Sequence, residues 1–313
     1  MKRLVFCSIF ITDAVAAAAG VGALYYYKGG SASVYVLLFA AICIVALLTA
    51  GMLSSVISKR MYKEIDLMRE ELTKQQTELA KAYEAQDKMR QEFTANVSHE
   101  LKTPLTSISG FAEIIQGGLV KNREDVSRFA GNIYDEAQRL ILLVGDIMKL
   151  SQLDEDAVPA QKELIDLYET AQAVISQLKS TAAKRGVKFT LEGEHVSIVG
   201  VEQIVDEIIY NLCDNAIKYN KENGWVTVRV YRSDSGVVVS VSDTGIGIPQ
   251  EDLERIFQRF YRVNKSHSKE IGGTGLGLSI VKHGAAYHNA EIKVESKLGE
   301  GSRISVIFPS IQM

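Results

Sequence analysis

Two long apolar runs near the start of the chain constrain its fold more than any other feature. Residues 4–26 and 34–57 are mostly apolar, and each run exceeds twenty residues, enough for a helix to cross a hydrocarbon core about 30 Å thick. A cleaved signal peptide is the alternative for the first run. That run, however, exceeds an h-region of about 7–15 residues, and a second run follows. We therefore expect a transmembrane hairpin over residues 1–58.

Basic residues flank these runs. Lys2 and Arg3 precede the first run, Lys59 and Arg60 follow the second, and Lys28 lies between them. The preference of Lys and Arg for the cytoplasmic side predicts a multi-pass cell-membrane protein with both termini in the cytoplasm. The connection over residues 28–33 is too short to fold as an outer domain.

Asp13 lies inside the first apolar run. A charge there costs about 2.5–3.5 kcal/mol on insertion scales, so such a residue usually faces a partner or a cavity. A shallow, hydrated or protonated position near one interface is an equally good interpretation. Asp13 and the short loop motivate the hypothesis of a sensing partner in the membrane, such as a transporter; the bilayer and the cytoplasm are the other sources of a signal.

Residues 59–92 repeat apolar side chains at alternating steps of three and four. The positions are Ile65, Met68, Leu72, Leu79, Ala82, Met89 and Phe93, with Gln75 and Gln86 in two polar gaps. A seam sustained over four heptads predicts a coiled-coil signalling helix. A single amphipathic helix lying on its own protein is the alternative. The glutamines weaken the seam, and we hypothesise that this makes the helix easy to shift.

A helical hairpin is expected over residues 93–158, broken at Gly117-Gly118. The apolar positions are Val97, Leu101, Ile108, Val126, Phe129, Ile133, Leu140, Leu143, Ile147 and Leu150, with Glu136 as a polar position in the second helix. One hairpin cannot cover its own seam. Two hairpins from two chains are therefore expected to form a four-helix bundle, which predicts a homodimer.

His99 lies about 200° around the helix from Val97, so it is expected to project into solvent. Glu100 is adjacent and can accept a proton from Nδ1, which leaves the Nε2 lone pair for attack on phosphorus. Thr103 lies one turn further on, and Pro104 is expected to kink the helix. A lone surface histidine is usually inert, but these neighbours and the residues described next favour a reactive one.

Pro159, within residues 154–160, marks a predicted linker, and the pattern becomes mixed over residues 159–313. Strands are expected at 187–191, 197–199, 225–231, 237–241, 290–295 and 304–308, and helices near 166–184, 201–219 and 276–287. Helices on one face of a mostly antiparallel sheet form an α/β sandwich. We therefore expect an α+β multidomain membrane protein with segments 1–58, 59–92, 93–158 and 159–313.

The sandwich segment carries residues suited to a nucleotide. Asn211 and Asn215 lie one helical turn apart and offer amide oxygens, which are ligands that Mg²⁺ accepts; two surface asparagines are the alternative. Lys218 supplies charge for the phosphates of ATP, and Tyr219 can lie against the adenine or the ribose. Asp243 ends a strand and can accept a hydrogen bond from the adenine amino group.

Glycines and one arginine complete this set. Gly245 and Gly247 let the backbone approach the base. Arg262 follows an aromatic segment that is expected to end a helix, and it is expected to contact the γ-phosphate. A loop before a helix directs amide groups at phosphate, and this loop consists of Gly272, Gly273, Thr274, Gly275, Leu276 and Gly277. Residues 263–272, with Lys265, His267 and Lys269, are predicted to be a mobile lid over ATP.

Five blocks in fixed order resemble the H, N, G1, F and G2 boxes of bacterial two-component sensor histidine kinases. They are residues 98–104, 211–219, 243–247, 257–262 and 273–278. The resemblance covers about residues 85–310. It implies a HisKA dimerisation and phosphoacceptor domain and a HATPase_c domain of the GHKL or Bergerat type, shared with gyrase-type topoisomerases, mismatch-repair ATPases and one chaperone family.

The resemblance also implies the reaction. ATP phosphorylates His99 with Glu100 as the base, and the phosphoryl group passes to an aspartate in the receiver domain of a separate response regulator. Thr103 positions water in a reverse phosphatase reaction. Whether phosphorylation is in cis or in trans depends on the connection 117–125 and stays open. Asn220, where the family often has Ser or Thr, is a small departure.

Charge and the motifs weigh against other functions. A net charge of −3 and a pI near 6.0 argue against a nucleic-acid partner. A membrane-anchored ATP-binding adaptor without kinase activity is the second interpretation, and Asn215, Asp243 and Arg262 argue against it. A topoisomerase or chaperone-type ATPase is the third; the histidine helix and the apolar runs argue against that class.

Overall fold

The computed structural model describes residues 2–29, 31–120, 122–154, 161–263 and 273–310. The chain divides into two compact units, residues 1–90 and 91–313. Each unit is described by itself. The four-segment division expected from the sequence stays a prediction.

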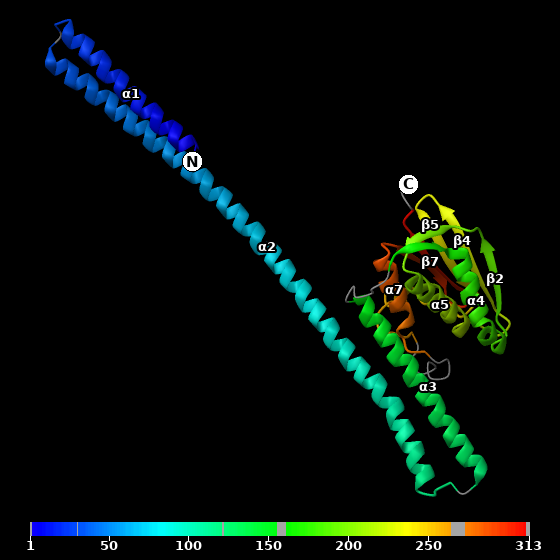
Figure 1. Cartoon of the computed structure of the whole chain (residues 1–313). Helices are drawn as coiled ribbons and strands as arrows, with labels where there is room; N and C mark the ends of the chain where they lie inside the picture. The colour runs from blue at the N-terminus through cyan, green and yellow to red at the C-terminus, as the bar shows by residue number, and fades with distance from the viewer. Residues whose placement is uncertain (1, 30, 121, 155–160, 264–272, 311–313) are drawn as a thin grey trace. The chain divides into compact units, whose positions relative to one another are not determined.

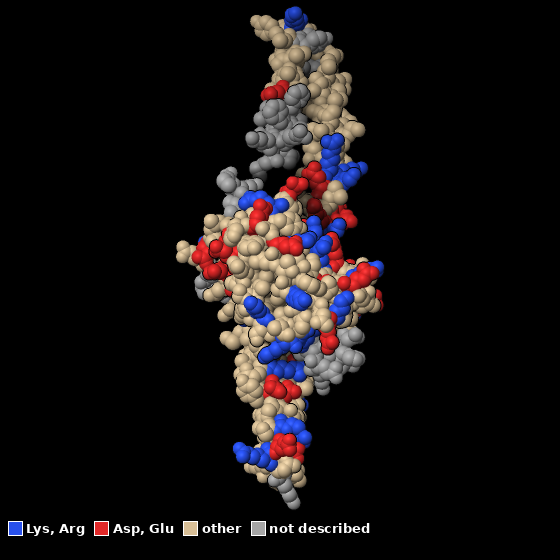
Figure 2. Space-filling view, turned by 90° about the vertical axis from the view of Figure 1, so that its right-hand side faces the viewer, with Lys and Arg blue, Asp and Glu red and all other residues tan. Residues whose placement is uncertain are grey.

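The first unit consists of α1 (Lys2–Tyr27) and the first part of α2 (Ala32–Gln116). The backbone N–H of Lys28 donates to Leu24 O (3.2 Å), and Gly29 has φ +89°, so the chain reverses after α1 and α2 runs back beside it (Figure 1). Among the described residues, one helix is long and apolar enough to cross a membrane, Val36–Gln116, and a shorter apolar stretch covers Thr12–Leu24. Figure 2 shows few Lys, Arg, Asp or Glu side chains over the described part of α1 and the apolar start of α2.

Residues 59–92 lie entirely within α2, as the heptad pattern predicts for a helix. Apart from Phe93, which is half-buried, the apolar positions of that pattern are exposed in the single chain; Met68 and Leu79, for example, are 65% and 58% exposed. The coiled coil itself stays a prediction.

The helical hairpin of the second unit forms as expected. α2 ends at Gln116, Gly118 has φ +66°, and α3 covers Arg123–Asp154. The rings of Phe111 and Phe129 lie 5.7 Å apart across the hairpin. Pro104 is buried, and α2 continues through it, so the proline does not end the helix.

The sandwich is built from two sheets and a layer of helices. In chain order the elements are β1 (Glu163–Asp166), α4 (Leu167–Lys184), β2 (Lys188–Gly193), β3 (Ser197–Gly200), α5 (Glu202–Lys218), β4 (Trp225–Ser233), β5 (Gly236–Asp243), η1 (Gln250–Asp252), α7 (Gly277–Tyr287), β6 (Glu291–Lys297) and β7 (Gly301–Phe308). β1 pairs with β3, and the larger sheet has the order β2-β4-β5-β7-β6. Only the β2–β4 pair is parallel among the described strands.

Helices α4, α5 and α7 cover one face of the larger sheet (Figure 1). Apolar side chains recur every three or four residues along α5, and Val205, Ile208 and Ile209 are fully buried. They pack in one core with Val226 and Val228 of β4. The predicted α/β sandwich is therefore confirmed, and it fixes the C-terminal half of α5 and the end of β5, where the candidate nucleotide residues lie.

Two local predictions need correction. β1 was not expected, because four residues directly before a helix give little periodicity; its pairing with β3 supplies the strand. The aromatic segment before Arg262 was expected to end a helix, but residues 253–260 form turns, and Phe260 has φ +62°. The predicted linker around Pro159 and most of the predicted lid, including Lys265, His267, Lys269 and Gly272, lie outside the described residues.

Candidate functional site

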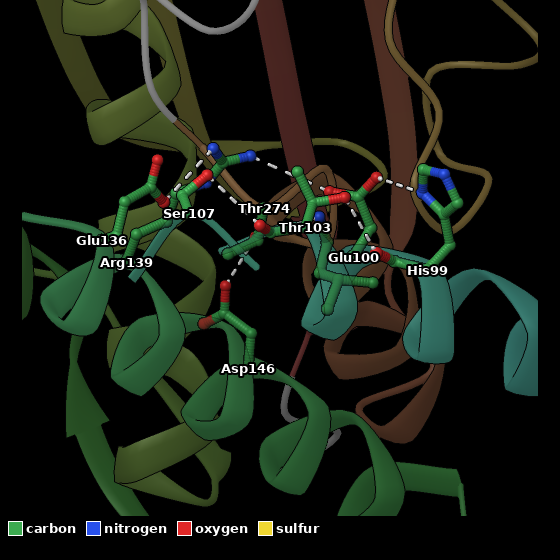
Figure 3. Close-up of polar contacts among 9 residues, drawn as sticks. His99, Glu100, Thr103, Ser107, Glu136, Arg139, Asp146 and Thr274 are labelled. Carbon is green, nitrogen blue, oxygen red and sulfur yellow. Dashed lines mark hydrogen bonds and ion pairs between the residues drawn. The ribbon is translucent and has the colours of Figure 1, made fainter. Parts of the chain in front are cut away.

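His99 projects from α2 into solvent, as expected, with its side chain 80% exposed. Its Nδ1 lies 3.7 Å from Glu100 Oε1 (Figure 3). The Thr103 hydroxyl donates to the His99 carbonyl oxygen (3.1 Å), so it lies one turn from the histidine and not against the imidazole. Nε2, on the far side of the ring from Nδ1, is thus the nitrogen left for an incoming phosphorus.

Asn211 and Asn215 lie one turn apart on α5 and face the start of α7. The Asn211 amide nitrogen donates to Glu207 O (2.8 Å), which leaves Oδ1 as its acceptor atom. A Cβ on Gly277 would lie 2.7 Å from that Oδ1 and 3.7 Å from Asn215 Nδ2, so the two amides converge beside this glycine. Glycine at position 277 is what lets α7 begin there.

Lys218 and Tyr219 end α5. Lys218 Nζ lies 2.5 Å from Asp214 Oδ2, so the lysine expected to meet phosphate is held by an ion pair in this structure. Tyr219 is the C-cap, and its carbonyl accepts from Ile246 N (3.1 Å). The end of α5 and the loop after β5 are therefore joined.

Asp243 lies at the end of β5, where its Oδ1 accepts from Gly245 N (2.8 Å) and Ser302 N (3.3 Å). Burial raises its pKa, and these two hydrogen bonds oppose the rise. With Oδ1 occupied, Oδ2 is the oxygen that can accept from an adenine amino group. A Cβ on Gly245 would lie 2.2 Å from Tyr219 O, and Gly247 has φ +70°. Both positions therefore require glycine.

Arg262 and the glycine-rich loop lie together. A Cβ on Gly273 would lie 3.6 Å from Arg262 Nη2, and Phe260 N donates to Gly275 O (2.9 Å). Gly275 has φ +73°. Leu276 is buried and α7 begins at Gly277, so the loop leads into a helix N-terminus, a setting that favours phosphate.

Thr274 makes a contact that the sequence did not indicate. Its hydroxyl donates to Asp146 Oδ2 of α3 (2.6 Å; Figure 3). Burial raises the pKa of Asp146, and the Thr274 hydrogen bond acts against this. The two residues are 128 positions apart, and a carboxylate on an otherwise amphipathic helix carries no signal of such a partner.

Apolar side chains surround this contact. Leu143 and Leu150, which the heptad pattern assigned to the hairpin seam, are 4% and 0% exposed in the single chain and pack against Leu276 and Ile280. Phe93 and Phe260 join the cluster, with ring centroids 5.9 Å apart. The glycine-rich loop of the sandwich is therefore packed on α3.

The donor set fits magnesium. Asn211 Oδ1 and the Asn215 side-chain amide converge at the start of α7, and Mg²⁺ is usually held by few protein oxygens together with water and substrate phosphates. These two residues would hold the ion, and it would neutralise phosphate charge there.

The fold and this site define a chain in which a helical hairpin with an exposed histidine is joined to an ATPase-type α/β sandwich. Residues 200–312 match the family described as "Histidine kinase-, DNA gyrase B-, and HSP90-like ATPase". Residues 89–156 match the "His Kinase A (phospho-acceptor) domain". The chain therefore belongs to the two-component sensor histidine kinases.

Curated proteins of similar sequence are also sensor histidine kinases. The sensor histidine kinase WalK of Bacillus subtilis is 35% identical over 230 residues, covering 72% of this chain and 38% of WalK. The sensor-like histidine kinase SenX3 of Mycolicibacterium smegmatis is 35% identical over 221 residues, covering 70% of this chain and 57% of SenX3. The chain thus spans 38% of the length of one of these relatives and 57% of the other.

Solved structures share the fold. Full-length ShkA in complex with AMPPNP matches with a TM-score of 0.52 at 26% identity, over 70% of this chain and 46% of ShkA. Histidine kinase ThkA in complex with the response regulator protein TrrA matches with a TM-score of 0.56 at 24% identity, over 73% of this chain and 66% of that chain.

Proposed function

We propose that this protein is a membrane-bound sensor kinase that phosphorylates its own His99 from ATP and passes the phosphoryl group to an aspartate of a response regulator. One observation carries the proposal: an exposed imidazole beside Glu100 belongs to the same chain as a sandwich in which Asn211 lies beside the glycine-rich loop and Asp243 ends β5 against Gly245. The family membership supports the same reaction.

The first step forms one bond and breaks another. The Nε2 lone pair of His99 attacks the γ-phosphorus, and the bond from that phosphorus to the β–γ bridging oxygen breaks, so ADP leaves with the electron pair. The Nδ1 proton passes to Glu100, which lies 3.7 Å away, and the phosphorylated ring is left neutral. Attack needs a neutral ring with its proton on Nδ1, and Glu100 favours that tautomer.

The sandwich binds ATP and Mg²⁺ in this proposal. Asp243 Oδ2 accepts from the adenine amino group, Tyr219 lies by the base or the ribose, and Lys218, Arg262, Gly273, Thr274 and Gly275 serve the phosphates. Asn211 and Asn215 are the metal ligands. The AMPPNP complex of ShkA, which has a similar fold, supports nucleotide binding at such a domain.

A partner protein, the response regulator, takes part both in the transfer of the phosphoryl group from His99 and in its later removal by hydrolysis. An aspartate oxygen of the regulator's receiver domain attacks the phosphorus, the N–P bond breaks, and His99 recovers its lone pair. Thr103 positions water when the kinase acts as a phosphatase on the regulator. The regulator complex of ThkA supports a partner of this class.

Membrane insertion and dimerisation complete the proposal. Two spans near residues 4–26 and 34–57 place both termini in the cytoplasm, which the apolar stretches of α1 and α2 support. A homodimer forms through the hairpin, because Ile141 and Met148 of α3 are 63% and 60% exposed and apolar faces of this kind are usually covered. A sensing partner in the membrane contacts the first span near Asp13.

A phosphorylation assay on the full chain in lipid nanodiscs tests the reaction. Radiolabelled ATP is expected to give acid-labile label in the wild type, and His99→Gln and Asn215→Ala are expected to abolish it. The first variant removes the nucleophile, and the second removes a magnesium ligand. ATP binding measured in parallel should survive His99→Gln and weaken in Asn215→Ala.

His195→Gln is the matched control, since His195 is also exposed (62%) but pairs with Asp166, the N-cap of α4. It should label like the wild type. If the His99→Gln variant still becomes labelled, a residue other than His99 accepts the phosphoryl group. An unlabelled wild type that still binds ATP would favour the ATP-binding adaptor.

A further inference from the structure

Arg139 of α3 lies between two carboxylates (Figure 3). Its Nη2 is 3.8 Å from Glu100 Oε2 of α2, and its Nη1 is 3.9 Å from Glu136 Oε2 on its own helix, one turn earlier. Phe111 and Phe129 pack between the same two helices nearer the turn. The packing of the hairpin thus brings a cation from α3 to the side chain that lies next to His99.

The two oxygens of Glu100 have different neighbours. Oε1 faces Nδ1 of His99 at 3.7 Å, and Oε2 faces the guanidinium of Arg139. A carboxylate with a cation on one side and an imidazole on the other is restricted in the directions it can point. Without the cation, a glutamate that is 35% exposed can rotate toward solvent.

Glu136 in turn restricts Arg139. Its Oε2 is buried and has no hydrogen-bond partner among the described residues. A buried carboxylate oxygen needs a compensating charge, and the guanidinium of Arg139 is the cation that lies near it. Glu136 was expected only as a polar position in the hairpin seam; the structure gives it this partner.

We propose that Arg139 is a positioning residue for phosphorylation of His99: anchored by Glu136, it holds the Glu100 carboxylate with Oε1 toward Nδ1 of the imidazole. The inference rests on the proposed function. Arg139 does not touch the reacting atoms. It fixes the orientation of the group that receives the Nδ1 proton while Nε2 forms the bond to phosphorus and ADP leaves.

Arginine suits this place better than lysine. The guanidinium is planar, and its separate nitrogens can face two carboxylates at once, whereas an ammonium is a point charge on a flexible stem. The three side chains are each about one-third exposed, and ion pairs of that exposure contribute little to folding. Substitution should therefore lower the rate while the chain still folds, with a loss of stability confined to what Glu136 loses when its nearby cation is removed.

The test is single-turnover autophosphorylation by the full chain in lipid nanodiscs, at saturating ATP. Arg139→Gln is expected to lower the rate roughly tenfold, since a positioned acid or base typically contributes ~10²–10⁴-fold and orientation is part of that. The ATP dissociation constant should stay within about twofold. Arg139→Lys should recover part of the rate, and Glu136→Gln should lower it by a smaller factor.

A double-mutant cycle with Glu100→Gln separates positioning from a structural role. If Arg139 acts through Glu100, adding Arg139→Gln to Glu100→Gln lowers the rate no further. The same tenfold loss in both backgrounds would overturn the proposal. The unfolding midpoint identifies any variant that does not fold, and Arg139→Lys then provides the comparison.

Arg128→Gln is the matched control. Arg128 lies on the same helix and also pairs with a carboxylate, Asp125 at 2.7 Å, on a more exposed part of α3. It should react at the wild-type rate, and an equal loss there would count against a specific role for Arg139. A wild type that incorporates no label at His99 would overturn the proposed function and this inference together. Normal labelling of both the wild type and Arg139→Gln would overturn the inference alone.

Discussion

The surroundings of Asp243 affect its ionisation, and its ionisation should affect ATP binding. It is a half-buried carboxyl at the end of a strand, with one oxygen held by two backbone N–H groups. Burial raises its pKa. Because a carboxylate accepts a hydrogen bond from the adenine amino group and a protonated oxygen does so poorly, ATP affinity should depend on this ionisation.

The affinity for ATP should fall as the pH is lowered. ATP binds the ionised form of Asp243 more tightly, so the affinity is highest above the pKa of Asp243 and falls as the pH drops through that pKa. Because that pKa is raised, the fall should begin at a higher pH than for an ordinary aspartate, whose pKa is about 3.9. Calorimetric titration of ATP between about pH 8 and pH 5 measures this, with pH effects on the nucleotide common to all variants.

Asp243→Asn is expected to weaken ATP binding by about 1.5–3 kcal/mol, as for loss of a charged hydrogen bond, and to lack the Asp243 part of the pH dependence. Asp234→Asn, in the exposed turn between β4 and β5, is the control and should match the wild type. An Asp243→Asn profile parallel to that of the wild type would assign the titration to another group.

At the scale of elements, the packing of α5 on α7 determines the candidate metal site. The helices approach closely because two positions of α7 that face α5 are glycines: a Cβ on Gly284 would meet Ile204 Cγ2 at 2.9 Å, and one on Gly277 would meet Asn211 Oδ1 at 2.7 Å. The first glycine allows the core to close. The second leaves space for the amide oxygen that we assign to Mg²⁺.

Gly277→Ala therefore tests the role of this packing. The added methyl group should displace the Asn211 side chain and weaken Mg²⁺-dependent ATP binding roughly tenfold, about 1.4 kcal/mol. Gly131→Ala on α3 is the control, because a Cβ there meets nothing within 4 Å. ATP titrations with and without Mg²⁺ make the measurement, and a loss of equal size in both would point to the backbone of the loop instead.

At the scale of the whole molecule, α3 has two different apolar faces. Leu143 and Leu150 are covered by Leu276 and Ile280 of the same chain. Tyr134, Ile141 and Met148, spaced seven residues apart, are 65%, 63% and 60% exposed. The first face holds the sandwich, and the second is the face that a second copy of the hairpin can cover.

Ile141→Glu should accordingly shift the protein from dimer toward monomer, because it places a charge in a buried interface. Light scattering of the detergent-solubilised full chain gives the mass. Asp135→Arg changes an exposed charge on another side of α3 and should leave the dimer intact. A dimer that survives Ile141→Glu would locate the main contact in the apolar spans or the predicted coiled coil.

The local spacing of apolar side chains along the sequence predicted much of the fold. The break of the hairpin at Gly117, the alternation in β4 and β6 and the three helices of the sandwich all follow from side-chain spacing within about ten residues. The exposure of His99 is of this kind, because helical geometry alone puts it opposite Val97. Segments with little periodicity were the ones missed: the four-residue β1, and the aromatic segment before Arg262, which was expected to end a helix but is formed of turns.

The sequence by itself determined which residues bear the chemistry and on which local element each lies. Only the tertiary structure decided which of them meet. Thr274 reaches Asp146 across 128 positions, and the buried His288 ring accepts from Val201 N across 87. Arg139 meets Glu100 because α3 returns alongside α2. The physical reason is that spacing along the chain specifies backbone geometry over a few turns, whereas contacts between distant residues depend on how all the apolar faces bury one another.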